Sequence, residues 1–136
     1  MFLGLAAVEN DEVIGWAGIS SGEAYDGNVY ELYPLIVRPD RRREGIGQML
    51  LVAIEESARK NGGLTIHMGV NADRSDDSTS LTNVDLYDNL PKHICEFNPG
   101  THQLAVFYIK NGYKLIGVMP DAYGRGKPDI VLDKRL

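Results

Sequence analysis

A basic segment punctuated by glycines is the part of this sequence whose residue types and spacing best suit chemistry. It runs from Arg38 to Gln48 and follows the apolar residues Leu35-Ile36-Val37. The residues after it recur at helical spacing with apolar or small side chains, at Ile46, Met49, Leu50, Ala53, Ile54, Ser57 and Ala58. The first turn of a helix has unpaired N–H groups and a partial positive charge. The pattern therefore predicts a strand, a basic turn and a helix N-terminus that suit phosphate oxygens.

Other phosphate-binding turns match this segment less well. A dinucleotide-binding turn needs three glycines in G-x-G-x-x-G, and a triphosphate loop needs Gly-Lys followed by Ser or Thr. Arg42-x-x-Gly45-x-Gly47 supplies only G-x-G after arginines, and in Gly124–Pro128 a proline follows the lysine. The remaining alternative is a solvated arginine run. The spacing resembles the acetyl-coenzyme A pyrophosphate loop of the GNAT superfamily of N-acetyltransferases, which reads Gln or Arg, two residues, Gly, one residue, and Gly or Ala.

Composition narrows the class of protein. The chain has 136 residues, 43% of them hydrophobic, which is enough for one core, so residues 1–136 are expected to form a single domain. With 14 Lys and Arg against 19 Asp and Glu, the charge of −5 argues against nucleic acid and favours a cationic partner. No run is long and apolar enough for a membrane span, and no signal peptide is evident, so a cytoplasmic location is expected. The single Cys95 and the three isolated histidines predict no metal site.

Periodicity and turn residues predict alternating strands and helices. Pro34 cannot donate a ladder hydrogen bond, so it predicts a bulge or lost pairing in its strand. A strand, a helix and a strand around the basic turn predict two parallel neighbours joined by a right-handed crossover. The expected strands are 5–9, 13–20, 29–37, 64–70, 113–119 and 130–134, and the expected helices are 46–60, 84–90 (ending near Pro91) and 104–110.

Longer blocks carry a closer resemblance. From Val29 onward the chain is similar to the aminoglycoside 6′-N-acetyltransferases of the GNAT superfamily, in the blocks 30–37, 62–66, 85–87, 107–114 and 127–130. The resemblance implies an α/β (α+β) fold. Its sheet would be mixed and mostly antiparallel, with a splayed central strand pair and flanking helices. It also implies acetyl-coenzyme A as acetyl donor and a homodimer.

The resemblance assigns roles to the cofactor-facing residues. The backbones of Leu35, Ile36 and Val37 would bind the pantetheine arm, and one of their N–H groups, taken as that of Leu35, would stabilise the oxyanion. Tyr108 would protonate or stabilise the departing thiolate, although a tyrosine on a helix is also a common core residue. The pyrophosphate would be held by Arg42, Arg43, Glu44, Gly45, Ile46, Gly47 and Gln48.

The acceptor residues follow from the same resemblance. Glu31 would attract a cationic small-molecule amine and accept its proton, directly or through water, unless it is simply a strand-edge glutamate. Tyr25 and Asp76 match positions that contact the sugar substrate. Tyr33 stands where the family has histidine, so an interaction that depends on an imidazole is absent. The segment 71–103 is rich in acids, which suits either a solvated loop or a surface for a cation.

The chain also departs from the family at its start. The family places a strand and helices before the first hairpin, and this sequence begins at the hairpin. The N-terminus is therefore short. Either it is truncated, a second subunit completes the acceptor pocket, or the site is more open. The expected reaction is direct acetyl transfer in a ternary complex, because Cys95 has no identifiable basic partner. The alternatives are a polyamine or protein amine as acceptor, or a domain that binds acyl-coenzyme A without turnover.

Overall fold

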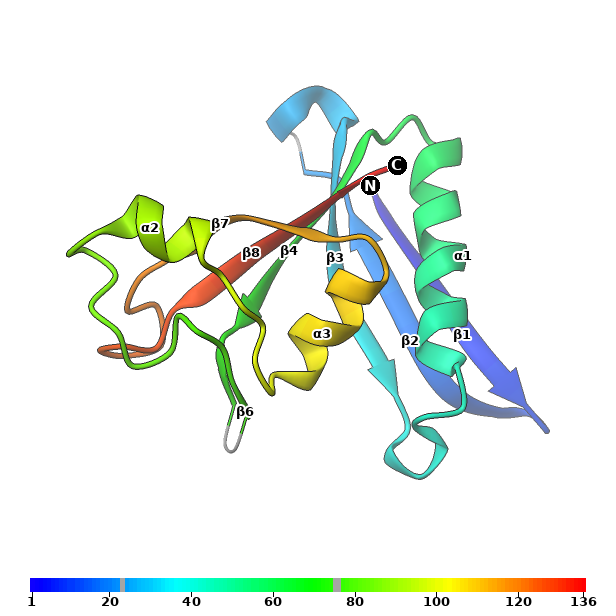
Figure 1. The fold of residues 1–136 in the computed structure, drawn as a ribbon. Coiled ribbons are helices and arrows are strands. Elements are labelled where there is room, and N and C mark those ends of the chain that lie inside the picture. The colour runs from blue at the N-terminus through cyan, green and yellow to red at the C-terminus, as the bar shows by residue number, and fades with distance from the viewer. Residues whose placement is uncertain (23, 75–76) are drawn as a thin grey trace. The chain divides into compact units, whose positions relative to one another are not determined.

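The computed structural model describes residues 1–22, 24–74 and 77–136, which divide into two compact units (Figure 1). The first unit comprises Met1–Met68 with Arg135–Leu136, and the second comprises Gly69–Lys134. In chain order the elements are β1 Phe2–Glu9, β2 Glu12–Ser20, η1 Ala24–Gly27, β3 Val29–Val37, η2 Pro39–Arg41, α1 Ile46–Lys60, β4 Thr65–Asn71, β5 Asp73–Arg74, β6 Asp77–Ser78, α2 Leu90–Cys95, α3 Gln103–Lys110, β7 Lys114–Met119 and β8 Asp129–Arg135.

The first unit is a sheet with the strand order β1-β2-β3-β4. The pairs β1/β2 and β2/β3 are antiparallel, whereas β3 and β4 are parallel and are connected through α1. The predicted hairpin, the predicted strand 29–37 and the predicted parallel neighbours are therefore confirmed. The predicted helix 46–60 coincides with α1.

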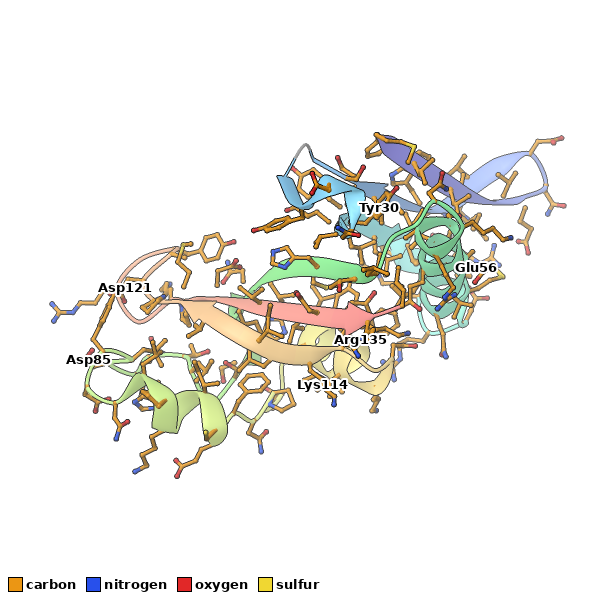
Figure 2. The ribbon with its side chains drawn as sticks, turned by 90° about the horizontal axis from the view of Figure 1, so that it is seen from above. Tyr30, Glu56, Asp85, Lys114, Asp121 and Arg135 are labelled. Atoms are coloured by element: carbon orange, nitrogen blue, oxygen red, sulfur yellow. The ribbon has the colours of Figure 1, made fainter. Side chains whose placement is uncertain are left out.

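Helix α1 packs on one face of strands β1, β2 and β3 (Figure 2). Gly15 on β2 permits this packing, since a Cβ there would lie 2.8 Å from Leu50 Cδ1. The predicted buried stripe is partly wrong, because Met49 is 59% exposed and Leu51 is buried instead. Two overlapping apolar stripes exist on this helix, and only packing against the sheet selects one. The apolar residues that α1 buries are Ile46, Leu50, Leu51, Ile54 and Ala58.

A glycine turn connects α1 to β4. Gly62 has a φ of 85°, the left-handed conformation that glycine adopts without steric cost. Gly63 leaves room for the ring of Tyr30 on β3, because a Cβ there would lie 2.8 Å from Tyr30 Cδ2. Tyr30 is only 1% exposed. The glycines after α1 therefore both end the helix and allow the turn to lie close to β3.

The second unit begins at Gly69, within β4. It contains the strand order β4-β8-β7, with β7 and β8 antiparallel. The short strands β5 and β6 pair within the segment 71–83, which was predicted as loop. The predicted helix 104–110 and the two closing strands are confirmed by α3, β7 and β8. The fully buried large side chains of the second unit are Leu81, His102, Tyr113, Pro128, Ile130 and Leu132.

The prediction of a helix over 84–90 that ends near Pro91 is wrong. Helix α2 instead begins at Leu90, and Pro91 lies in its first turn. A proline is tolerated there because the N–H that it lacks would have no partner inside the helix. The side chain of Asn89 caps this helix by accepting a hydrogen bond from the Lys92 N–H at 3.4 Å. Asn89 followed by Pro91 is therefore the start signal of a helix at this position.

Candidate functional site

Strand β3 contains the bulge that Pro34 predicted. Ala17 of β2 pairs with Leu35, but Ile19 pairs with Leu32, so β3 has one residue more than β2 in this interval. The extra length lies opposite Gly18, where a Cβ would lie 2.8 Å from the Tyr33 carbonyl oxygen. A bulge bends its strand and changes the direction of the side chains that follow.

The parallel ladder between β3 and β4 is short. It joins Val29 with Thr65, Tyr30 with Ile66 and Glu31 with His67. Strand β3 then continues to Val37 without a further described partner in β4. This confirms the expected splay of the central strands. It leaves backbone groups of 32–37 on that side available to a ligand, and these include the predicted pantetheine-binding residues.

The turn after β3 is held in place by ion pairs with the β1–β2 hairpin. Arg38 donates to Asp40 at 2.7 Å and to Glu12 at 2.9 Å, and Arg41 is paired with Glu9. The Arg38 guanidinium lowers the pKa of Asp40, and Arg41 lowers the pKa of Glu9. Arg38 and Arg41 are therefore occupied by carboxylates of the protein itself.

Arg42 and Arg43 differ from these two arginines. In the part of the chain that the structure describes, neither pairs with a carboxylate, and both are exposed. Arg42 Nε donates to the Val37 carbonyl oxygen at 3.3 Å. Glu44, predicted alongside them, accepts from Arg41 Nε at 2.8 Å, so its carboxylate is already engaged. Two guanidinium groups of the basic run thus stay available to an anion.

The N-terminus of α1 lies directly after these arginines. Its N-cap is Gly45, which has a φ of 83° and provides no side-chain cap. No acceptor among the described residues is hydrogen-bonded to the N–H groups of Ile46, Gly47 and Gln48. A Cβ at Gly45 would meet no atom within 4 Å, so the cap is open to solvent. Free N–H groups, a helix dipole and two guanidinium groups together fit a diphosphate.

The first unit also contains two predicted acceptor residues. Glu31 is exposed on β3, and its side-chain carboxylate has no hydrogen bond or ion pair with any described residue. Tyr25 is 72% exposed in η1, and its carbonyl oxygen accepts from the Asn28 N–H at 2.9 Å. The third predicted acceptor residue, Asp76, lies outside the described residues.

Tyr108 is a core residue of the second unit. It is 5% exposed, and its ring makes edge-to-face contacts with Phe107 and Tyr113 at centroid distances of 5.1 and 5.3 Å. Burial raises the pKa of the phenol above its ordinary value of 10.0. The hydroxyl has no partner among the described residues, yet no fully enclosed polar side-chain atom in that part of the chain lacks one. The Tyr108 hydroxyl therefore retains contact with solvent, which lets it reach a ligand.

Two histidines of the second unit, His102 and His93, make defined side-chain contacts. His102 is 1% exposed and caps α3, because its Nδ1 accepts from the Ala105 N–H at 3.1 Å. Its Nε2 donates to the Asn71 carbonyl oxygen at 2.8 Å, which assigns the tautomer. His93 contacts Asp88 at 2.7 Å. His102 thus caps a helix, and His93 contacts an exposed carboxylate.

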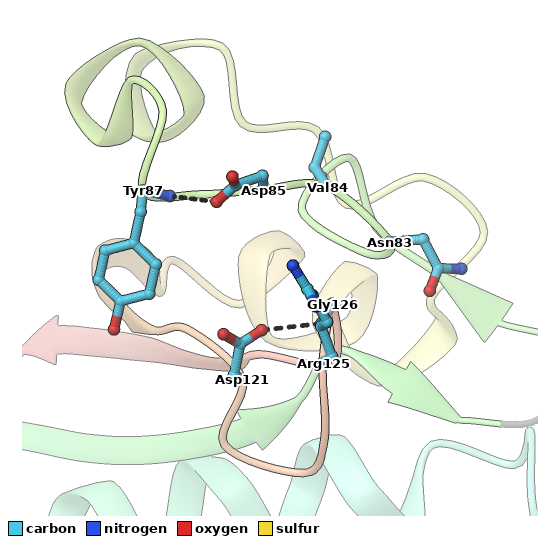
Figure 3. A pocket seen from close by; sticks show the side chains of 7 residues that line it. All are labelled: Asn83, Val84, Asp85, Tyr87, Asp121, Arg125 and Gly126. Carbon is cyan, nitrogen blue, oxygen red and sulfur yellow. Dashed lines mark hydrogen bonds between the residues drawn. The ribbon is translucent and has the colours of Figure 1, made fainter.

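The second unit has an open pocket of about 670 Å³ (Figure 3). Asp85 accepts from the Tyr87 N–H at 3.1 Å, and Asp121 accepts from the Gly126 N–H at 2.8 Å. Both carboxylates are exposed, and Arg125 lies at the same pocket (Figure 3). The carboxylates are thus partly engaged and mostly solvated.

Two further properties concern the described residues only. No group of three or more His, Cys, Asp or Glu among them is arranged to hold a metal ion. Within residues 1–22, 24–74 and 77–136, no helix has the length and apolar character needed to cross a membrane.

Comparison with known proteins agrees with the geometry. The model of the acetyltransferase (GNAT) family matches residues 1–83. An aminoglycoside 6′-N-acetyltransferase complexed with coenzyme A is 34% identical with a TM-score of 0.89, over 98% of this chain and 72% of that one. The aminoglycoside 6′-N-acetyltransferase from Enterococcus faecium is also 34% identical, with a TM-score of 0.88 and the same coverage of both chains. An aminoglycoside 6′-acetyltransferase type Ii is 31% identical with a TM-score of 0.68, over 98% of this chain and 68% of that one.

No curated protein sequence matched the chain. The family model nevertheless covers more than half of the chain, and the bulged, splayed β3 and the open N-terminus of α1 lie within the matched residues. The mixed, mostly antiparallel fold agrees with the solved structures. The chain therefore belongs to the acetyltransferase (GNAT) family, whose acetyl donor is acetyl-coenzyme A.

Proposed function

We propose that this protein transfers the acetyl group of acetyl-coenzyme A to a primary amine of an aminoglycoside, as a 6′-N-acetyltransferase does. The observation that carries the proposal is the N-terminus of α1, which has no side-chain cap, beside Arg42 and Arg43, which pair with no carboxylate among the described residues. The similarity to aminoglycoside 6′-N-acetyltransferases supports the acceptor class. In this proposal the two units act together as one catalytic domain over residues 1–136.

The cofactor would be held by residues of the first unit. Arg42 and Arg43 would pair with the diphosphate, and the N–H groups from Glu44 to Gln48 would donate to its oxygens. The backbone of 35–37, which lies beyond the short β3/β4 ladder, would bind the pantetheine arm. The Leu35 N–H would donate to the acetyl oxygen as negative charge develops there.

The acceptor would be bound near Glu31. An ammonium cannot attack a thioester until it loses a proton, and the unpartnered carboxylate of Glu31 can attract the cation and accept that proton. The nitrogen then forms the amide bond while the carbon–sulfur bond breaks. Tyr25 and Asp76 would contact the remainder of the acceptor.

Tyr108 would stabilise the departing thiolate. A thiol has an ordinary pKa of about 8.5. Burial raises the pKa of Tyr108, so a complete proton transfer from the phenol to the thiolate is unfavourable. Its partnerless hydroxyl can instead donate a hydrogen bond to the sulfur. Tyr108→Phe should therefore slow turnover about a hundredfold while the affinity for coenzyme A stays within about twofold.

Two predictions and two alternatives accompany the proposal. A homodimer and a cytoplasmic location both stay predictions. A polyamine or a protein amine is the alternative acceptor, and binding of acyl-coenzyme A without turnover is the alternative to catalysis.

The test is thiol release from acetyl-coenzyme A by the purified chain with kanamycin, spermidine or a lysine peptide. Saturable release with kanamycin is the expected result. Release with only spermidine or the peptide would keep the transfer reaction and replace the acceptor. Tight binding of coenzyme A with no release for any amine would overturn the catalytic proposal.

A further inference from the structure

One face of the first unit is free of α1 and mostly apolar. Trp16 lies over Gly4, because a Cβ at Gly4 would be 2.3 Å from the indole Cη2. Phe2 lies over Gly18 in the same way, at 2.8 Å from its Cζ. These two rings are 36% and 57% exposed, so they form a flat apolar surface across β1 and β2.

A row of polar side chains crosses this face. Ser20 on β2 pairs with Glu31 on β3, and Glu31 pairs with His67 on β4. Directly paired residues project on the same side of a sheet, and neighbouring strands lie about 4.8 Å apart. Tyr30 and Ile66, one position earlier on β3 and β4, are buried on the opposite side. The hydroxyl, the carboxylate and the imidazole therefore stand side by side.

The three groups differ in charge and exposure. Glu31 is exposed and has no partner among the described residues, whereas Ser20 and His67 are half-buried. An imidazole has two ring nitrogens, so His67 can keep a contact of its own and still present one nitrogen to a ligand. A hydroxyl both donates and accepts. The row thus offers one anionic acceptor between two groups that recognise hydroxyls.

We propose that Ser20 and His67 bind hydroxyl groups on either side of the acceptor's amine, while Glu31 binds the ammonium. This inference rests on the proposed function and narrows its substrate to a hydroxylated amine such as an amino sugar. The methylene groups next to an amine in a polyamine cannot hydrogen-bond with Ser20 or His67 and would desolvate them without compensation. A site that hydrogen-bonds a hydroxyl discriminates against an analogue that lacks it for this reason.

The experiment compares His67→Phe with the wild-type chain at pH 8, using kanamycin and spermidine as acceptors. We expect His67→Phe to raise the KM and the Kd for kanamycin at least about tenfold. The Kd for acetyl-coenzyme A should stay within about twofold. The values for spermidine should stay unchanged or fall, because spermidine gains nothing from the imidazole that it desolvates. His67→Gln, which keeps a hydrogen-bonding side chain, should restore most of the kanamycin affinity. Equal losses for kanamycin and spermidine would overturn the inference.

Two further variants guard against a folding artefact. Ser20→Ala removes a single oxygen and should weaken kanamycin binding in the same selective way. His93→Gln makes the same chemical change as His67→Gln in the second unit and should change neither acceptor. Calorimetric Kd values obtained with coenzyme A present keep the two proposals separate. If the variants lose kanamycin binding selectively and no turnover is seen, the proposed roles of Ser20 and His67 are supported and catalysis is rejected. If kanamycin binding is unchanged in both Ser20→Ala and His67→Phe, those roles are rejected.

Discussion

The N-termini of the helices differ between the two units. In the second unit, His102 caps α3 and Asn89 caps α2, each through its own side chain. In the first unit, α1 begins at Ile46, and its N-cap Gly45 provides no side-chain cap. The two arginines beside it, Arg42 and Arg43, have no carboxylate partner in the part of the chain that the structure describes. A protein normally satisfies the first N–H groups of a helix by itself. This difference supports our proposal that the first N–H groups of α1 donate to the diphosphate of the cofactor.

The largest expected effect comes from giving α1 a negative charge of its own. Gly45→Asp should be tolerated at the left-handed φ of 83°, because Asp adopts this conformation more readily than most residues. Its carboxylate would repel the diphosphate, so the Kd for coenzyme A should rise about a hundredfold. Titration calorimetry measures this Kd. Gly45→Asn is the matched neutral control and should cost about tenfold or less. Equal losses for the two variants would show that charge is not the cause.

Removing one available arginine should have the next largest effect. Arg42→Ala should raise the Kd for coenzyme A by about tenfold to a hundredfold, because a charge-assisted hydrogen bond contributes about 1.5–3 kcal/mol. Arg59→Ala is the control, since Arg59 lies at the far end of α1 and is paired with Glu56. Its removal should leave the affinity unchanged. An unaltered Kd for Arg42→Ala would remove the phosphate-loop argument.

Removing the side-chain cap of α3 should lower the stability of the protein. His102→Ala removes the cap of α3 and the hydrogen bond to the Asn71 carbonyl, both at a buried position. The free energy of unfolding should fall by about 2 kcal/mol. Urea denaturation measures the change. His93→Ala, which removes the contact with the exposed Asp88 carboxylate, should cost less than about 1 kcal/mol. A smaller loss for His102→Ala than for His93→Ala would contradict the assigned cap.

The smallest expected effect is a pH dependence from Tyr108. Burial raises the folded-state pKa of this phenol, so its contribution to stability is fully present below the unfolded pKa of about 10 and declines as pH rises above it. At pH 11 the loss attributable to Tyr108 should be about 1 kcal/mol. Urea midpoints at pH 9 and pH 11 for the wild type and Tyr108→Phe give this difference. The same pH dependence in both proteins would show that Tyr108 is not buried in its neutral form.

Local signals predicted most of the first unit. The strand 29–37, the bulge at Pro34 and the helix 46–60 depend on alternation, on a missing donor and on glycine stops, which act over a few residues. The error at Pro91 arose because proline suits both the end and the first turn of a helix. The capping Asn89 was the signal that distinguishes them.

By itself the sequence determined the order of strands and helices in the first unit, the basic turn before α1 and the likeness to the acetyltransferase family. Only the tertiary structure decided which arginines are available. Arg38 and Arg41 are neutralised by Glu12 and Glu9, which lie 26 and 32 residues away. It likewise placed Ser20, Glu31 and His67 in one row, because they come from three strands that meet only in the sheet. Short-range patterns specify backbone conformation, whereas ion pairs and strand register depend on residues that are brought together by folding.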